Sequence, residues 1–217
     1  MKRSFIIIIV VFLCFGVSWD LWAKDPTVDE IINKVQARLN NAELITIEFT
    51  QTFYWSMTDE TQRYSGQIFI GKGDAFRIET LEQLLVSDGK SVWTLDKANQ
   101  QVIIDRLDKS QEDYLPRQLF FHFQRDYHAQ LEGTQDIGGK SCYHLLLQPK
   151  NEDVYVKKLD AWIDKGEWLT RQVSYLDVND NTTTYLIKSY QFASKSDPAL
   201  FQYAVPPGIE VIDLREN

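Results

Sequence analysis

Residues 44–55 read LITIEFTQTFYW, and the pattern of this stretch decides the fold class. Apolar and polar side chains alternate with a period of two, which is typical of a β-strand with one face in a core and the other in water. The first face carries Ile45, Ile47, Phe49, Gln51, Phe53 and Trp55. The stretch therefore predicts a long strand with one solvated face.

Similar strands follow along most of the chain. They are predicted at 64–70, 75–80, 83–87, 91–95, 101–105, 127–131, 141–148, 156–164, 167–177 and 182–192, with short elements at 201–205 and 209–214. Asp88-Gly89, between Val86 and Val92, is the pair typical of a type I′ hairpin turn. About ten or eleven antiparallel strands predict a mainly β (α+β) fold, built as one large curved sheet or barrel.

Two helices are predicted to interrupt the strands. The first has an apolar stripe on a 3.6-residue period, formed by Val28, Ile31, Ile32, Val35 and Leu39. Its start is marked by Asp25-Pro26 and by a capping-box pattern from Thr27 to Glu30. The second, shorter helix lies within 110–123 around Pro116 and has a roughly helical apolar spacing, which includes Leu115, Leu119 and Phe123.

The N-terminus has the features of a secretory signal peptide. Lys2 and Arg3 precede an apolar run at 5–17, and Ala23 offers a small residue at the cleavage position. The run of about 13 residues is shorter than the roughly 20 that a spanning helix needs, although an uncleaved anchor is the alternative. Lipidation at Cys14 is a further, weaker reading. We expect a signal peptide at 1–23, a single domain at 24–217 and a periplasmic location.

Charge and motif content exclude several classes of function. The chain has 31 acidic and 23 basic residues without a Lys/Arg cluster, which argues against nucleic acid and anionic lipid surfaces as partners. Cys-x-x-Cys, His-Glu-x-x-His, Gly-x-Ser-x-Gly and phosphate-binding glycine loops are absent. The sequence therefore predicts no metal, no cofactor and no catalytic residues.

One pair of residues leaves an enzymatic alternative open. Cys142 and His144 lie two residues apart on a predicted strand, so their side chains point to the same face. Such side chains stand about 6 to 7 Å apart, which is too far for a nucleophile and its base. We favour two packed side chains over a catalytic dyad.

Aromatic residues are abundant: 12 Phe, 10 Tyr and 6 Trp. An ordinary core explains most of them, because aromatic side chains dominate core packing. A single curved sheet with only two short helices over it also leaves room for an apolar cavity. The residues expected to line this cavity are Phe49, Phe53, Phe69, Phe76, Ile78, Val86 and Trp93. Alternation does not say which face of each strand points inward.

Two neighbouring stretches resemble a known family. Residues 66–79 read GQIFIGKGDAFRIE and residues 84–93 read LLVSDGKSVW, with Phe49-Thr50-Gln51 upstream and PPGIEVID at 206–213. Together they resemble the outer-membrane lipoprotein carrier family, LolA. The resemblance implies an unclosed antiparallel β-barrel with a helical lid, whose cavity shelters the acyl chains of lipoproteins. It also implies an inner-membrane ABC transporter as donor and an outer-membrane receptor or membrane as acceptor.

The resemblance further implies a lid and a basic residue that latches it. The lid would consist of Val28, Ile31, Ile32, Val35, Leu39, Leu115, Leu119 and Phe123. The family's usual Lys/Arg-Pro before the Phe-Arg strand is Lys72-Gly73 here, and its aromatic after that arginine is Ile78. We expect the latch at Lys72 or Arg77, and a lysine is the poorer donor to several carbonyl groups.

Two further readings stay open beside the carrier and the enzyme. A sensor of the same fold would bind lipid or lipoprotein and signal to a partner. A structural sheet protein would have a solid core and take up no apolar probe. A soluble carrier has no need of a second copy, so we expect a monomer.

Overall fold

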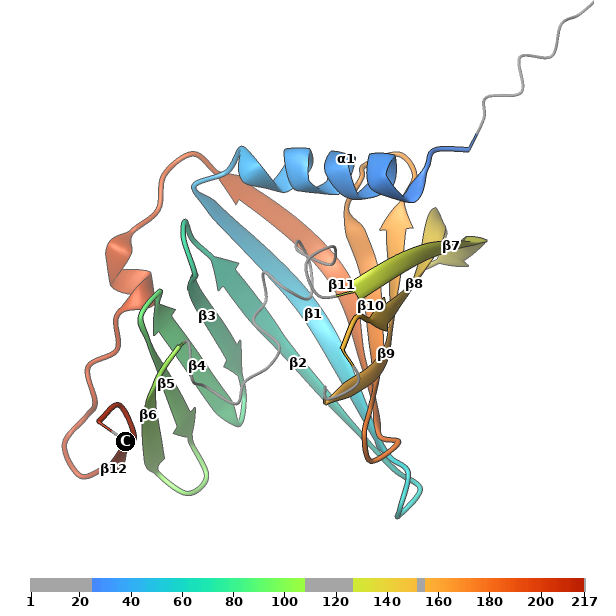
Figure 1. The fold of residues 1–217 in the computed structure, drawn as a ribbon. Helices are drawn as coiled ribbons and strands as arrows, with labels where there is room; N and C mark the ends of the chain where they lie inside the picture. The colour runs from blue at the N-terminus through green and yellow to red at the C-terminus, as the bar shows by residue number, and fades with distance from the viewer. Residues whose placement is uncertain (1–24, 108–126, 152–154, 217) are drawn as a thin grey trace, which may run out of the picture.

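The structure is a computed structural model that describes residues 25–107, 127–151 and 155–216 (Figure 1). Its elements are α1 (Val28–Asn40), β1 (Leu44–Trp55), β2 (Glu60–Ile70), β3 (Ala75–Thr80), β4 (Gln83–Asp88), β5 (Ser91–Asp96), β6 (Gln101–Arg106), β7 (Tyr127–Ile137), β8 (Lys140–Pro149), β9 (Val156–Asp164), β10 (Thr170–Asp177), β11 (Thr182–Ala193), the 3₁₀-helix η1 (Pro198–Phe201) and β12 (Glu210–Asp213). The predicted signal peptide and the predicted helix within 110–123 lie outside the described residues.

All described strands belong to one sheet. Its order is β12-β6-β5-β4-β3-β2-β1-β11-β10-β9-β8-β7. The pairing of β1 with β11 joins the two halves of the chain, and every neighbouring pair is antiparallel except β12 with β6. The predicted mainly β fold is confirmed, with two corrections: the sheet has twelve strands, and its last strand is parallel to its neighbour.

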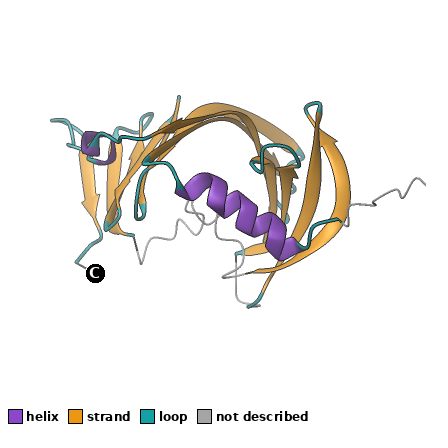
Figure 2. Ribbon diagram, turned by 90° about the horizontal axis from the view of Figure 1, so that it is seen from above, coloured by secondary structure: helices purple, strands orange, loops and turns teal. Residues whose placement is uncertain are grey.

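The sheet curves into an open arc, and α1 lies in the hollow of that arc (Figure 2). Register shifts on β11, β10, β9 and β7 interrupt the regular ladder, for example where β11 passes Glu48 and Phe49 of β1. Such bulges bend a strand and increase its twist. The arc stays open because its end strands, β12 and β7, do not pair with each other.

The helix α1 forms as its sequence predicts. The Thr27 hydroxyl accepts from the Glu30 N–H (3.2 Å), and the Glu30 carboxylate accepts from the Thr27 N–H (2.7 Å), which completes the capping box. The stripe is buried, with Ile31, Ile32 and Val35 at most 2% exposed. This stripe packs against the sheet and forms the largest apolar cluster of the described residues.

Two local predictions are wrong. Gly89 has a positive φ of 90° but Asp88 does not, so the β4–β5 turn is not type I′. Instead, the Asp88 carboxylate accepts from the N–H groups of Lys90 and Ser91 (2.9 and 2.8 Å). The element expected at 201–205 is not a strand, because η1 ends at Phe201 and irregular chain follows.

Asp177 organises the β10–β11 hairpin. It is 1% exposed, and its carboxylate accepts from the side-chain amide of Asn181, from the backbone N–H groups of Asn179 and Asn181 and from the hydroxyl of Tyr155. Burial favours the neutral acid, but these hydrogen bonds outweigh burial and lower the pKa of Asp177.

This lowered pKa predicts an acid-sensitive hairpin. A carboxyl group whose pKa is lowered in the folded state stabilises the fold at pH values above its ordinary pKa of 3.8. This stabilisation is lost as the pH falls through the folded-state pKa. We expect Asp177→Asn to lower the free energy of unfolding most at neutral pH, and progressively less below about pH 3.8. Urea unfolding over a pH series measures this difference. Asp180→Asn, at an exposed position of the same hairpin, is the control; an equal pH profile for both variants would contradict the assignment.

Candidate functional site

The inner face of the sheet is the face that α1 covers. Residues directly opposed on neighbouring antiparallel strands point to the same side, so the register assigns faces. One row crosses the sheet through Ile47, Ile68, Ile78 and Leu85. Ile47 and Ile68 pack in the same cluster as the α1 stripe, which places this row on the inner face.

The register divides the seven predicted cavity residues between the two faces. Phe49 and Phe53 follow Ile47 on the inner face of β1, and Phe76 and Ile78 lie on the inner face of β3. The neighbouring row crosses the sheet on the other side. It contains Thr46, Phe69, Arg77, Val86 and Trp93. Phe69, Val86 and Trp93 therefore lie on the outer face.

The outer face of β4–β6 has its own apolar cover. Val86 is fully buried there in a cluster whose partly buried members include Trp93, Tyr203 and Val205. The chain after η1 thus packs over this face and makes a second core. Its packing explains why β4 reads as continuous apolar residues, since both of its faces are covered.

The second half of the sheet supplies inner-face residues that the sequence analysis missed. They are Tyr143, Leu145, Leu147, Leu159, Ala161, Val173, Tyr175, Tyr185, Ile187, Tyr190 and Phe192. The alternation of Tyr143, Leu145 and Leu147 along β8 was a usable signal. The inner face is therefore apolar across both halves of the arc.

Phe49 belongs to the buried cluster that α1 shares with the inner face. Its ring is 1% exposed, lies against Gly66 and meets Tyr185 edge-on at 5.6 Å between centroids. A Cβ at residue 66 would come within 2.4 Å of the Glu79 carbonyl oxygen and 3.0 Å of the Phe49 ring, so only glycine fits. Farther along the same face, Phe53 and Trp55 pack edge-on at 4.5 Å and are only half-buried.

Lys72 contacts the end of α1. Its Nζ donates to the carbonyl oxygen of Asn40 (3.0 Å) and lies 3.6 Å from the Glu43 carboxylate. A cation at a helix C-terminus is stabilised by the helix dipole. Arg77, the other predicted latch residue, lies on the outer face and pairs with Glu79 (3.3 Å).

Two cations on α1 lie over aromatic rings, one in a loop and one in the sheet. The Lys34 ammonium is 4.0 Å from the ring centroid of Trp168, and the Arg38 guanidinium is 4.5 Å from that of Phe192. Trp168 lies in the loop between β9 and β10 and has a φ of +56°, a conformation that is rare for a bulky residue. The loop between β9 and β10 thus contacts one flank of α1.

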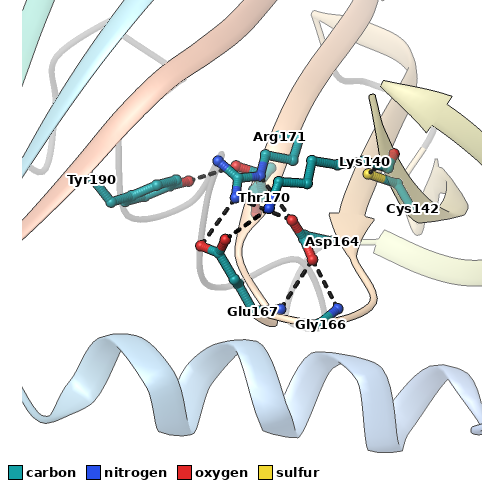
Figure 3. Close-up of polar contacts among 8 residues, drawn as sticks. All are labelled: Lys140, Cys142, Asp164, Gly166, Glu167, Thr170, Arg171 and Tyr190. Atoms are coloured by element: carbon teal, nitrogen blue, oxygen red, sulfur yellow. Dashed lines mark hydrogen bonds and ion pairs between the residues drawn. The ribbon is translucent and has the colours of Figure 1, made fainter. Parts of the chain in front are cut away.

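Asp164 fixes the shape of this loop (Figure 3). It is 3% exposed, and its carboxylate accepts from the N–H groups of Gly166 and Glu167 (2.8 and 2.9 Å) and from the guanidinium of Arg171 (3.0 Å). Burial opposes ionisation, but these donors outweigh burial and lower the pKa of Asp164. Beside this network, Tyr190 donates to the Thr170 carbonyl (2.7 Å), which ties β10 to β11.

Cys142 and His144 lie on the outer face and have separate partners. The Cys142 thiol is fully buried and lies 3.3 Å from the Lys140 carbonyl; burial raises its pKa to about 11. A nucleophilic cysteine needs the opposite shift. The His144 Nε2 lies 2.8 Å from Asp160, and its ring stacks on Trp162. The thiol and the imidazole therefore contact different partners.

No group of three or more His, Cys, Asp or Glu side chains among the described residues is arranged to hold a metal ion. No helix in the described part of the chain has the length and apolar character to cross a membrane.

Comparison with known proteins identifies the family. Residues 40–204 match the family model of the outer membrane lipoprotein carrier protein LolA. The chain is 27% identical over 189 residues to the outer-membrane lipoprotein carrier protein of Glaesserella parasuis, covering 86% of this chain and 87% of that one. It is also 27% identical over 188 residues to the carrier protein of Haemophilus influenzae, covering 85% and 88%.

A solved structure shares the fold. An uncharacterised conserved protein from Thermus thermophilus superimposes with a TM-score of 0.58 at 13% identity, covering 85% of this chain and 98% of that one. The family match spans most of the sheet, including β1 with its inner-face aromatic residues. The chain belongs to the outer-membrane lipoprotein carrier protein family, LolA.

Proposed function

We propose that this protein is a periplasmic chaperone that binds the acyl chains of lipoproteins on the inner face of its sheet and carries them to the outer membrane. The observation that supports the proposal is an apolar part of that face that the described residues leave only half-buried. It includes the apolar or aromatic side chains of Phe53, Ile78, Tyr175 and Tyr185. This surface suits a flexible apolar ligand and needs no cofactor or catalytic residue.

The energetics of acyl chains require direct transfer between partners. Burying a methylene contributes about 0.8 kcal/mol, so sheltering ten of them contributes roughly 8 kcal/mol. Release into water would then be too slow to be useful. The carrier must therefore pass its cargo directly between apolar partners. As the family resemblance implies, we infer an inner-membrane ABC transporter as donor and an outer-membrane receptor or membrane as acceptor, with the carrier working as a monomer.

The helix α1 serves as part of a lid in this proposal. Its buried stripe occupies one end of the inner face, and Lys72 holds its C-terminus. The second part of the lid would come from Leu115, Leu119 and Phe123, which lie outside the described residues. Arg77 is left out of the latch because it faces the other side of the sheet. Residues 1–23 would direct export and be removed.

Lys72→Ala is expected to loosen the last turn of α1. The Lys72 and Glu43 side chains are about half exposed, so the loss of stability should stay below about 1 kcal/mol. Hydrogen exchange of the amides near Asn40 should nevertheless accelerate up to about fivefold, while Lys72→Arg keeps wild-type exchange. Lys90→Ala, at an exposed turn, is the control. Unchanged exchange in Lys72→Ala would rule out a latch at this position.

Native mass spectrometry of the protein isolated from a periplasm that exports lipoproteins tests the function. We expect co-purified triacylated protein. A bare mass, together with no uptake of an apolar probe, would refute the carrier and favour the structural reading. Bound lipid without lipoprotein would favour a sensor. Cys142→Ser should carry cargo like the wild type, whereas an enzyme using this thiol would lose its activity.

A further inference from the structure

A groove of about 780 Å³ lies between the N-terminal half of α1 and the end of the sheet. The α1 side contributes Thr27, Val28, Asp29, Ile32 and Asn33, and the sheet side contributes Tyr127, His128 and Ala129 of β7 with Lys150 after β8. Its volume falls in the range of ordinary ligand sites. It opens at the edge of the arc, where β7 is the last strand.

We propose that this exit groove binds the extended polypeptide segment of the cargo next to its lipid anchor. The proposal rests on the proposed function and deepens it, because it assigns a site to the protein part of the same ligand. A lipoprotein has an apolar anchor and a polypeptide joined to it. When the acyl chains lie on the inner face, the polypeptide must leave the hollow along some path.

The exit groove is continuous with the inner face. Ile32 belongs to the buried stripe of α1, and Val28 packs against the same cluster. On the opposite wall, Tyr127 and Ala129 of β7 also pack against that cluster. The apolar cluster of the inner face therefore extends to both walls of the exit groove.

One wall of the exit groove is the edge of a sheet. No other described strand pairs with the outer edge of β7. Such an edge presents a row of backbone N–H and C=O groups that an added extended chain can pair with. Backbone pairing recognises an extended peptide independently of its side chains, which suits a carrier for cargo proteins of different sequences.

The side chains of the exit groove suit a peptide better than an anionic headgroup. Asp29 and Lys150 bring both signs of charge, and Asn33 and His128 add polar groups that donate and accept. A site for an anionic headgroup would need several cationic side chains around it. Mixed polar groups beside an apolar floor match the alternating chemistry of an extended polypeptide.

The test compares two ligands on four variants of the full protein. The probes are a triacylated cysteine followed by a short extended peptide, and the same triacylated cysteine as an amide without the peptide. Asn33→Trp on α1 and Ala129→Trp on β7 fill the exit groove from its two walls, because Ala129 packs on the α1 side of the sheet. Ala37→Trp on α1 and Gln130→Trp on β7 are matched controls, because both positions are exposed and outside the groove. Far-ultraviolet circular dichroism confirms that each variant is folded.

We expect the wild type to bind the lipopeptide more tightly than the amide. Both groove variants should then bind the lipopeptide about tenfold more weakly while keeping the affinity for the amide within about twofold. Equal affinities of the wild type for both probes would contradict peptide binding in the exit groove. Equal losses of lipopeptide affinity in the groove variants and the control variants would contradict it too. Failure of the wild type to bind either probe would refute the proposed function itself.

Discussion

Phe53→Asp is expected to abolish lipid binding without unfolding the protein. Phe53 lies on the inner face beyond α1 and is half-buried, so the folded protein tolerates a carboxylate there. In the loaded carrier, acyl chains would cover the same position. Burying an unpaired carboxylate costs several kcal/mol, which predicts at least about a hundredfold loss of affinity. Titration of a triacylated lipopeptide, followed by Trp fluorescence, measures the loss.

The neighbouring position on the same strand provides the control. Thr52 points to the outer face, where its hydroxyl lies 3.4 Å from the Nε of Arg63. An aspartate at residue 52 therefore meets a cation in solvent, and Thr52→Asp should bind the lipopeptide like the wild type. Equal losses of lipopeptide affinity in Phe53→Asp and Thr52→Asp would show that added charge alone weakens binding. The assignment of the acyl-chain site to the inner face would then be wrong.

Asp164→Ala is expected to be the most destabilising polar substitution that the structure identifies. It removes a nearly buried carboxylate that holds two loop N–H groups and Arg171, whose side chain is 14% exposed. Leaving a buried charge without its partner costs about 3 kcal/mol. Arg171 keeps a second contact with Glu167 (3.0 Å), but that carboxylate is 47% exposed and screened by water. Urea unfolding at neutral pH measures the loss.

Asp136→Ala is the matched control for this loop. Asp136 also accepts a backbone N–H in a hairpin turn, from Gly139 at 2.8 Å, but it is exposed and has no buried arginine. Its substitution should cost less than about 1 kcal/mol. A similar cost for Asp164→Ala would mean that the Arg171 network contributes little. The loop between β9 and β10 would then hold Trp168 against α1 by packing alone.

The strands and α1 could be predicted because their patterns are local. The alternation in residues 44–55 and the stripe from Val28 to Leu39 each show which side chains share a face. The capping box from Thr27 to Glu30 depends on residues three apart. Strand β12 was harder to predict from the sequence, because its four residues form a strand only by pairing in parallel with β6.

The faces of the middle strands could not be predicted from the residues alone. In β4, Leu84, Leu85 and Val86 are all apolar, because both faces of the strand are covered. Leu85 packs with Phe76 and Val92 on the inner face, and the C-terminal chain packs against the outer face. Nothing local reveals that Val86 and Trp93 lie under Tyr203, more than a hundred residues away. The same holds for Phe69, whose neighbours Ile68 and Ile70 take the inner face.

Predicting the contacts of α1 required different kinds of information. Lys72 came from a family resemblance, and the structure places it against the Asn40 carbonyl. Trp168 had no sequence signal at all, since its positive φ is unusual for its residue type and is imposed by the loop around Asp164. Tertiary contacts thus decide how the helix is held.

Photo-crosslinking from the acyl chain shows directly which face of the sheet holds the lipid. A triacylated lipopeptide with a diazirine in one acyl chain is bound to the full protein and irradiated, and the modified peptides are mapped by mass spectrometry. We expect crosslinks on the inner face around Phe53, Ile78 and Tyr185. Crosslinks confined to the outer face near Phe69, Val86 and Trp93 would contradict an acyl-chain site on the inner face.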